Sequence, residues 1–151
     1  DKIRLAETIA AECLAGRIRF LGRIVTGLYD RALRKLDITV NQTTILVFLT
    51  LHPETSQSSI GRILQMEKST VSRNLDRMRK KGWIEISPGS EWSVQAVRVT
   101  ASGDRLLLSL YREWEKAQSA TRELLGDEGI RSVHTIFNTL KEKDFAAGSD
   151  L

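Results

Sequence analysis

The sequence is poor in the residues that build disulfide-linked, metal-binding and membrane-spanning proteins. Its single cysteine, Cys13, excludes an internal disulfide and fits a reducing cytoplasm. Its two histidines lie far from that cysteine, so we predict no metal site. No apolar run approaches the roughly 18 residues of a membrane span, and no secretory signal pattern is present. We therefore expect a cytoplasmic protein with no cofactor and no membrane partner.

Signatures of catalysis are also missing. The sequence has no glycine-rich phosphate loop, no paired carboxylate site and no arrangement of a nucleophile with a histidine. Its 151 residues, 41% hydrophobic and 28% charged, suit one compact domain or two closely joined lobes. Because the chain begins at Asp1 rather than methionine, we expect it to have been trimmed. We predict that the protein is not an enzyme.

What the sequence does contain is a helix-turn-helix pattern over residues 58–83. Ile60, Ile63 and Leu64 give a first short segment one apolar stripe. Residues 65–67 then have about the length of a helix-turn-helix corner. The pattern predicts two short helices that pack against each other at an angle.

The second segment of the motif has two chemically different sides. Val71, Leu75 and Met78 recur at i, i+4 and i+7, and Gly82 ends the helix. The other sides carry Lys68, Ser69, Thr70, Ser72, Arg73, Asp76, Arg77, Arg79 and Lys80. Arginine suits guanine edges, and serine and threonine suit phosphates or bases in a major groove. The alternative is an ordinary solvated helix face, and the residues that follow favour DNA recognition.

Two short strands follow the motif directly. Residues 83–87 and 94–100 alternate apolar and polar side chains, and Pro88 and Gly89 mark a turn between them. A helix-turn-helix followed by a β-hairpin is a winged helix-turn-helix. The predicted fold class is therefore mainly α with a small β-hairpin.

Long helices are predicted at both ends of the chain. The first forty residues form one helix with the apolar stripe Leu14, Ile18, Leu21, Val25, Leu28 and Ala32. Another long helix is capped by Thr100 and ends at Gly126, and Asp127 caps a last helix. These stripes exceed what one small winged domain covers, so we predict that both ends dimerise with a second chain. Two-fold symmetry then places two recognition helices roughly 34 Å apart and requires a near-palindromic operator.

Between these ends we predict a short buried helix. Asn41 is its N-cap, and His52 with Pro53 stops it after Leu51. Residues 54–57 read as a connector, and Ser56 or Ser58 caps the first motif helix. We divide the chain into a helical dimerisation domain, residues 1–36 and 104–151, and a winged helix-turn-helix domain, residues 37–103.

Charge is distributed unevenly along the chain. Residues 57–100 contain eight basic and four acidic side chains, whereas the residues after Thr100 have a net charge of −2. A basic middle segment is expected to meet phosphate, and a mildly acidic end to meet protein.

The motifs STVSRNLDRMRKKGWIE and VRVTASG, in that order and spacing, resemble the MarR (multiple antibiotic resistance regulator) family. The resemblance extends from about Cys13 to Leu140. It implies a dimeric winged-helix transcriptional regulator, usually a repressor. Many members of the family release double-stranded DNA when a small phenolic or other lipophilic anion binds. Such effectors bind between the dimer helices and the winged lobe. Matching positions make Ser69, Thr70, Ser72, Arg73 and Arg77 the recognition-helix contacts.

The wing departs from the family pattern. Val94 and Gln95 stand where the family has arginines, and Glu91 would be repelled by the DNA backbone. We expect Trp92 to stabilise the hairpin, with packing on sugar as the alternative. Taken together, the predicted DNA contacts are Ser58, Lys68, Ser69, Thr70, Ser72, Arg73, Arg77, Lys80 and Arg98. The poor wing supports a second hypothesis, a winged-helix protein–protein interaction module with weak or lost DNA binding.

Two further sites are open to more than one interpretation. An effector pocket is predicted from Arg17, Tyr29, Tyr111 and Trp114, although aromatics at helical spacing also serve as core residues. Cys13 is interpreted as a small buried packing residue. The alternative is redox sensing, as in a family branch with a lone cysteine early in the first helix, where Arg17 would favour the thiolate. Residues 41–51 lack the tyrosines of that branch.

Overall fold

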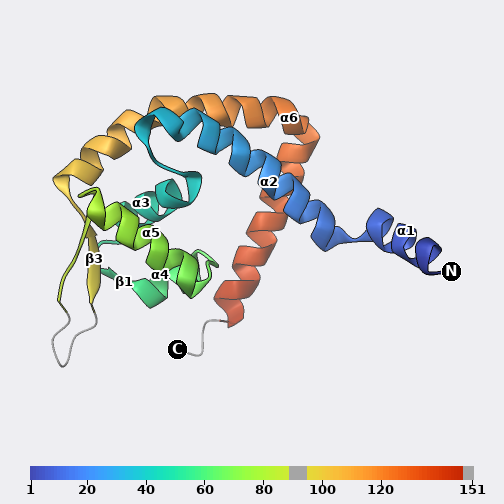
Figure 1. Cartoon of the computed structure of the whole chain (residues 1–151), viewed down its shortest axis with the longest axis horizontal. Helices are drawn as coiled ribbons and strands as arrows, with labels where there is room; N and C mark the ends of the chain where they lie inside the picture. Colours follow the sequence, from blue (N-terminus) through green and yellow to red (C-terminus); the bar gives the residue numbers. More distant parts are fainter. Residues whose placement is uncertain (89–94, 148–151) are drawn as a thin grey trace.

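The computed structural model describes residues 1–88 and 95–147, with side chains as far as residue 143. Its elements are α1 (Lys2–Glu12), α2 (Leu14–Leu33), the 3-10 turn η1 (Arg34–Leu36), α3 (Val40–Leu51), β1 (Thr55–Ser56), α4 (Gln57–Ile63), α5 (Lys68–Lys80), β2 (Ile84–Ile86), β3 (Ala96–Val99) and α6 (Ala101–Ala147). Helix α2 packs along the first part of α6, and α3, α4, α5 and the strands lie together beneath one end of this pair (Figure 1). The mainly α fold with a small sheet confirms the predicted winged helix-turn-helix.

The N-terminal helix is not continuous, contrary to the prediction. Cys13 adopts an extended conformation with φ −66° and ψ 103° and separates α1 from α2. Its Sγ accepts a hydrogen bond from the Gly16 backbone N at 3.4 Å and so caps α2. Because α1 buries no residue within the single chain, no packing holds it in line with α2. Figure 1 shows α1 extending away from the other elements.

Helix α3 begins two residues earlier than predicted, and its cap is Thr39 rather than Asn41. Thr39 Oγ1 accepts from the Gln42 backbone N at 3.3 Å, and Gln42 Oε1 accepts from the Thr39 backbone N at 3.1 Å. This reciprocal capping box satisfies two backbone donors that the first helical turn leaves free. The predicted end is confirmed, because His52 is the C-terminal cap.

The sheet has one strand more than the predicted hairpin. Strand β3 lies in the middle of the order β1-β3-β2, and both of its neighbours are antiparallel to it. The interpretation of residues 54–57 as a plain connector is therefore wrong. Thr55 pairs with Val97 and Ser56 with Ala96, which attaches the start of α4 to the base of the wing.

The last helix is broken at the predicted position. Gly126 has φ 64° and ψ 172° within α6, a conformation that residues with a Cβ rarely adopt. The chain is helical on both sides of this glycine, and the second part of α6 turns sharply away from the first (Figure 1). The glycine thus sets the direction of the C-terminal part.

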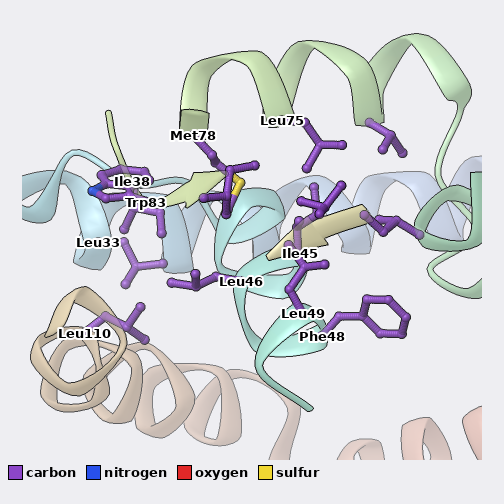
Figure 2. Close-up of a cluster of buried hydrophobic side chains, with 14 residues drawn as sticks. Leu33, Ile38, Ile45, Leu46, Phe48, Leu49, Leu75, Met78, Trp83 and Leu110 are labelled. Carbon is purple, nitrogen blue, oxygen red and sulfur yellow. The ribbon is translucent and has the colours of Figure 1, made fainter. Parts of the chain in front are cut away.

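One cluster of buried apolar side chains holds these elements together. It consists of Leu33, Ile38, Ile45, Leu46, Phe48, Leu49, Ile60, Val71, Leu75, Met78, Trp83, Ile84, Val97 and Leu110. Figure 2 shows the α3 side chains of Ile45, Leu46 and Leu49 at its centre, with Leu75 and Met78 of α5 on one side and Leu110 of α6 on the other. The recognition helix and the long helices therefore share a single core.

A buried carboxylate adds a polar link between η1 and α6. Glu113 lies 2.6 Å from Lys35 Nζ and 3.1 Å from Lys116 Nζ. The hydrogen bond from Lys35 holds the pKa of Glu113 below its ordinary value, and Lys116 contributes in the same direction. Because the carboxyl is buried, these two cations supply the partners that water would otherwise provide.

Candidate nucleic-acid interface

Helix α5 buries its apolar side completely. Val71, Leu75 and Met78 are 0%, 1% and 0% exposed, which confirms the face predicted from their spacing. Asn74 is buried beside them, and its Nδ2 donates to the Thr70 carbonyl at 2.9 Å. The rotation of α5 about its own axis is therefore fixed by packing.

The opposite side of α5 is open. The predicted contact residues Lys68, Ser69, Ser72, Arg73, Arg77 and Lys80 are exposed, and Thr70 is half-buried. Among the described residues, Arg73 and Arg77 form no ion pair. Both guanidinium groups thus keep their donors for another molecule.

The corner before α5 is held by the backbone. Gln65 has a left-handed φ of 52°, and the Met66 N donates to the Gly61 carbonyl at 2.9 Å. Ile60 is fully buried, but Ile63 is 55% exposed, so the predicted apolar stripe of the first motif helix is wrong at this position. The reason is that α4 ends at Ile63, where the chain turns toward α5.

Two predicted DNA contacts, Ser58 and Lys68, meet in one surface hollow. This hollow of about 630 Å³ lies between α4, the start of α5 and the base of the wing. Its other lining residues are Ser56, Gln57, Gly61, Arg62, Met66 and Gln95. Arg62 was not among the predicted contacts, although its position in the basic motif could have suggested it. The hollow gathers hydroxyl, amide and cationic groups that suit a phosphate.

A second hollow lies on the other flank of α5. It has a volume of about 380 Å³ and is lined by Asp30, Thr39, Asn41, Thr70, Arg73, Asn74 and Arg77. Asp30 Oδ1 accepts from the Val40 backbone N at 2.7 Å, so α2 also helps to hold the start of α3. The two arginines of α5 therefore stand over a groove whose remaining groups are mainly neutral and polar.

The C-terminal end of α5 neutralises part of its own charge. Asp76 lies 2.8 Å from Lys80 Nζ and 3.2 Å from Arg79 Nη2. Hydrogen bonds from Lys80 and then Arg79 hold the pKa of Asp76 below its ordinary value. Lys80 therefore reaches a phosphate only by leaving or sharing Asp76, whereas Arg73 and Arg77 have no such competitor among the described residues.

The only basic side chain predicted at the wing is already engaged. Arg98 Nη2 lies 2.7 Å from Glu54 Oε1, and both residues are exposed. Glu91, Trp92 and Val94 lie outside the described residues, so their predicted roles stay predictions. Gln95 is exposed beside the hollow that contains Ser58 and Lys68.

Comparison with known proteins agrees with this geometry. The model of the MarR family matches residues 36–91. The M. tuberculosis regulator MosR, in a crystal structure with DNA, is 26% identical and superposes with a TM-score of 0.74, covering 91% of this chain and 99% of MosR. A chain similar over nearly its whole length and in its helix-turn-helix segment shares more than a common architecture. The chain is therefore similar to the MarR family in sequence over its winged segment and in fold over nearly its whole length.

Two further relatives fit this assignment. A mutant MarR from E. coli, complexed with operator DNA, is 18% identical with a TM-score of 0.75 and covers 87% of this chain and 96% of MarR, which shows the shared fold. The repressor IacR of Pseudomonas putida is 30% identical over 63% of this chain, and the match spans about half of IacR, 53%. The protein is a DNA-binding transcriptional regulator similar to the MarR family. The prediction that it is not an enzyme is confirmed by the family.

The residues predicted to bind an effector are dispersed in this chain. Tyr29 donates from its hydroxyl to Gln118 Oε1, which links α2 to α6. Tyr111 and Trp114 stack on each other with ring centroids 5.8 Å apart, and the hydrogen bond to Glu115 raises the pKa of Tyr111. Arg17 instead donates to the Ala11 carbonyl. It lies about 18 Å along α2 from Tyr29, at 1.5 Å per residue.

Cys13 is exposed, so its interpretation as a buried packing residue is wrong for the single chain. The physical reason is that it occupies the break between α1 and α2, where its sulfur caps a helix and contacts no core. Its alternative role in redox sensing stays a prediction. Within the described ranges, no group of acidic, histidine and cysteine side chains is placed to hold a metal, and no helix is long and apolar enough to cross a membrane.

Proposed function

We propose that this regulator is a homodimeric repressor that recognises a near-palindromic operator in double-stranded DNA. The observation that carries the proposal is the geometry of α5, whose apolar side is fully buried while its hydroxyl and guanidinium groups are exposed. Such a helix has the width and chemistry to enter a major groove. MosR and MarR, whose fold it shares, were crystallised with DNA.

Dimerisation is proposed for residues 1–36 and 104–151, and DNA binding for residues 37–103. The proposed dimer surface comprises the large apolar side chains that the single chain leaves exposed on its first two helices and beyond the break in α6. These are Ile3, Leu5, Ile9, Leu14, Ile18, Phe20, Leu21, Val133, Ile136, Phe137 and Leu140. A monomer rarely exposes so much apolar surface on neighbouring turns of its helices, and a second copy buries it.

Within the DNA-binding domain we propose different tasks for different side chains. Arg73 reads a base edge, because it is exposed on the open side of α5 and forms no ion pair among the described residues. Ser58 and Lys68 hold the DNA backbone at the hollow beside α4, while Ser69, Thr70, Ser72 and Arg77 complete the contact along α5. Lys80 and Arg98 contribute less, because each has an acidic neighbour.

Release by a small lipophilic or phenolic anion completes the proposal. Tyr29 and Trp114 line the partly buried margin of the core between α2, α6 and the winged segment, and Tyr111 stacks beside Trp114. An aromatic anion that inserts there would contact both proposed domains. Arg17 joins such a site only if the partner copy supplies it, since its own α2 holds it far from Tyr29.

The test is an affinity titration on DNA selected from a random library, with Arg73→Ala as the variant. We expect Arg73→Ala to lose about 1–3 kcal/mol on the selected site and much less on random DNA, because it removes a base contact. Arg112→Ala, an exposed arginine on α6, is the control and should match the wild type. Equal loss on both DNAs would show that Arg73 touches only phosphate.

The same titration separates the proposal from a protein–protein interaction module. The ion pair between Arg98 and Glu54 favours that alternative, because Arg98 is the only cation predicted to contact DNA from the wing. A repressor loses affinity steeply as salt rises, with a slope of about −0.9 per phosphate contacted. If no DNA is enriched from the library at low salt, the DNA-binding proposal is wrong and the module is favoured.

A further inference from the structure

Two segments join the winged lobe (residues 37–103) to the helical arm (α2 and α6), and each contacts part of the same three-residue stretch. The first segment reaches Asp37 after η1, and the second runs through Thr100 into α6. That three-residue stretch directly follows the recognition helix α5: Lys81 bonds to Asp37 of the first segment, and the carbonyls of Gly82 and Trp83 accept from Thr100 of the second. We propose that these contacts are a positioning device that fixes the angle of α5 relative to the helical arm and so sets the half-site spacing that the dimer accepts. The inference rests on the dimeric DNA-binding function proposed above.

Lys81 fastens the first segment. Its Nζ lies 2.7 Å from Asp37 Oδ2 and also donates to the Asp37 carbonyl. The same ammonium stands 4.5 Å from the centroid of the Trp83 ring, within range of a cation–π interaction. Asp37 has a left-handed φ of 53°, which turns its carbonyl and its carboxylate toward one cation. Lys81 is therefore occupied by the protein, unlike Arg73 and Arg77.

Thr100 fastens the second segment. Its backbone N donates to the Trp83 carbonyl at 3.0 Å, and its hydroxyl donates to the Gly82 carbonyl. The same hydroxyl accepts from the Gly103 N at 3.2 Å and so caps α6. Gly103 is packed so tightly that an added Cβ would stand 2.3 Å from the Trp83 carbonyl oxygen. The start of α6 is thus closely packed against the residues that follow α5.

The Trp83 side chain extends the device into the core. It is 8% exposed and belongs to the cluster that contains Leu33 of α2 and Leu110 of α6. Figure 2 shows Trp83, Ile38 and Leu33 at the same end of this cluster, between α5 and the helix that carries Leu110. A rotation of α5 against the arm must break polar contacts on both segments and also disturb this packing.

The consequence for DNA binding follows from symmetry. In a two-fold dimer each protomer places one recognition helix on one half-site. Variation in the angle between its winged lobe and its helical arm therefore changes the distance between the two recognition helices. A stiff connection accepts one half-site spacing, and a loose one accepts several. A change in the lobe angle therefore alters the preference for one half-site spacing over another. A change in the stability of the fold alone does not alter that preference.

The experiment measures the affinity of variants for the selected operator and for operators with one base pair inserted or removed at the centre. Asp37→Asn removes the ion pair, and asparagine tolerates the left-handed backbone at this position. Lys81→Met removes the donors and keeps an apolar stem. Thr100→Ala removes the hydroxyl, and Thr100→Ser restores it. Glu123→Gln, an exposed acid on α6, makes the same charge change as Asp37→Asn and is the matched control.

We expect the wild type, Glu123→Gln and Thr100→Ser to prefer one spacing by about tenfold or more, and the other three variants by only about threefold or less. Losing an acid raises affinity for any DNA, so reduced selectivity in Asp37→Asn cannot come from charge. The midpoint of urea unfolding identifies any variant that is simply unfolded. Unchanged spacing preference in folded Asp37→Asn and Thr100→Ala overturns the inference and leaves the proposed function intact. A wild type that selects no DNA overturns both.

Discussion

Arg98 illustrates how one acidic neighbour decides the use of a basic side chain. From its place in β3 it was predicted to contact DNA, yet its guanidinium lies 2.7 Å from Glu54 Oε1. Glu54 follows the end of α3 and has a φ of 65°. Its separation of 44 positions from Arg98 leaves no local pattern that predicts their meeting. The exposed pair is worth little to stability, so its main effect is to compete with phosphate for Arg98.

We predict that Glu54→Gln tightens DNA binding. The change frees Arg98 for the backbone, so affinity should rise and the salt slope should steepen by about one counterion. The measurement is a titration of affinity against salt concentration on the selected operator. Glu123→Gln provides the control for loss of a negative charge far from the wing, and its slope should equal that of the wild type. If both variants have the wild-type slope, Arg98 does not reach DNA even when it is free.

The other residues of the interface differ in how far sequence alone could place them. The buried positions Val71, Leu75 and Met78 follow from helical periodicity, because the amphipathic spacing fixes which side faces the core. The meeting of Ser58 with Lys68 and Gln95 in one hollow depends on the corner angle and on the sheet. Those are tertiary features, and no spacing within α4 or α5 encodes them.

At the scale of elements, local capping chemistry decides where α3 begins. The sequence Thr39-Val40-Asn41-Gln42 offers two possible caps. One is Asn41 acting alone, and the other is a complete capping box of Thr39 and Gln42. The box prevails because its two side chains satisfy two backbone donors, whereas one asparagine satisfies one. This boundary was readable from sequence and was assigned to the wrong residue.

We predict that Thr39→Ala lowers the free energy of unfolding by about 1 kcal/mol, since it removes the cap of a buried helix. Asn41→Ala is the matched control and should change it by much less, because Asn41 is exposed and already inside the helix. Urea unfolding followed by circular dichroism measures both. A larger effect at Asn41 than at Thr39 would contradict the observed cap.

Two other elements could not be predicted, for different physical reasons. Strand β1 has only two residues, and its extended conformation is stabilised by pairing with β3 about forty residues later. The break at Cys13 interrupts a sequence with a continuous apolar stripe from Leu14 onward. Periodicity reports which side of a helix is apolar, but it does not report whether adjacent helices are collinear.

At the scale of the whole molecule, the dominant feature is apolar surface that the single chain leaves uncovered. Phe137 and Ile136 are each 60% exposed beyond the break at Gly126, and Ile18 of α2 is 68% exposed. Burial of such side chains is worth about 1.5–3 kcal/mol each, which is sufficient in sum to drive association. The length of the helices made this surface predictable, whereas the direction of the C-terminal part depends on the backbone at Gly126.

We predict that the wild type has about twice the monomer mass of 17.0 kDa by light scattering at micromolar concentration. Phe137→Asp should shift the population toward monomer, because a charge in an apolar interface loses its water. Leu108→Asp is the control, since Leu108 is 79% exposed on the part of α6 that packs along α2 of its own chain. A wild type that remains monomeric at this concentration would contradict the proposed homodimer.

The central claim is that the polar side of α5 faces the duplex, and site-directed photocross-linking tests it most directly. The single cysteine makes this simple, because Cys13→Ser leaves a background into which Ser72→Cys on α5 or Thr44→Cys on the exposed side of α3 places the only thiol. After attachment of a short photoactivatable group and irradiation with the selected operator, the account predicts cross-links to bases from position 72 and none from position 44. Cross-linking from position 44 with none from position 72 would contradict it.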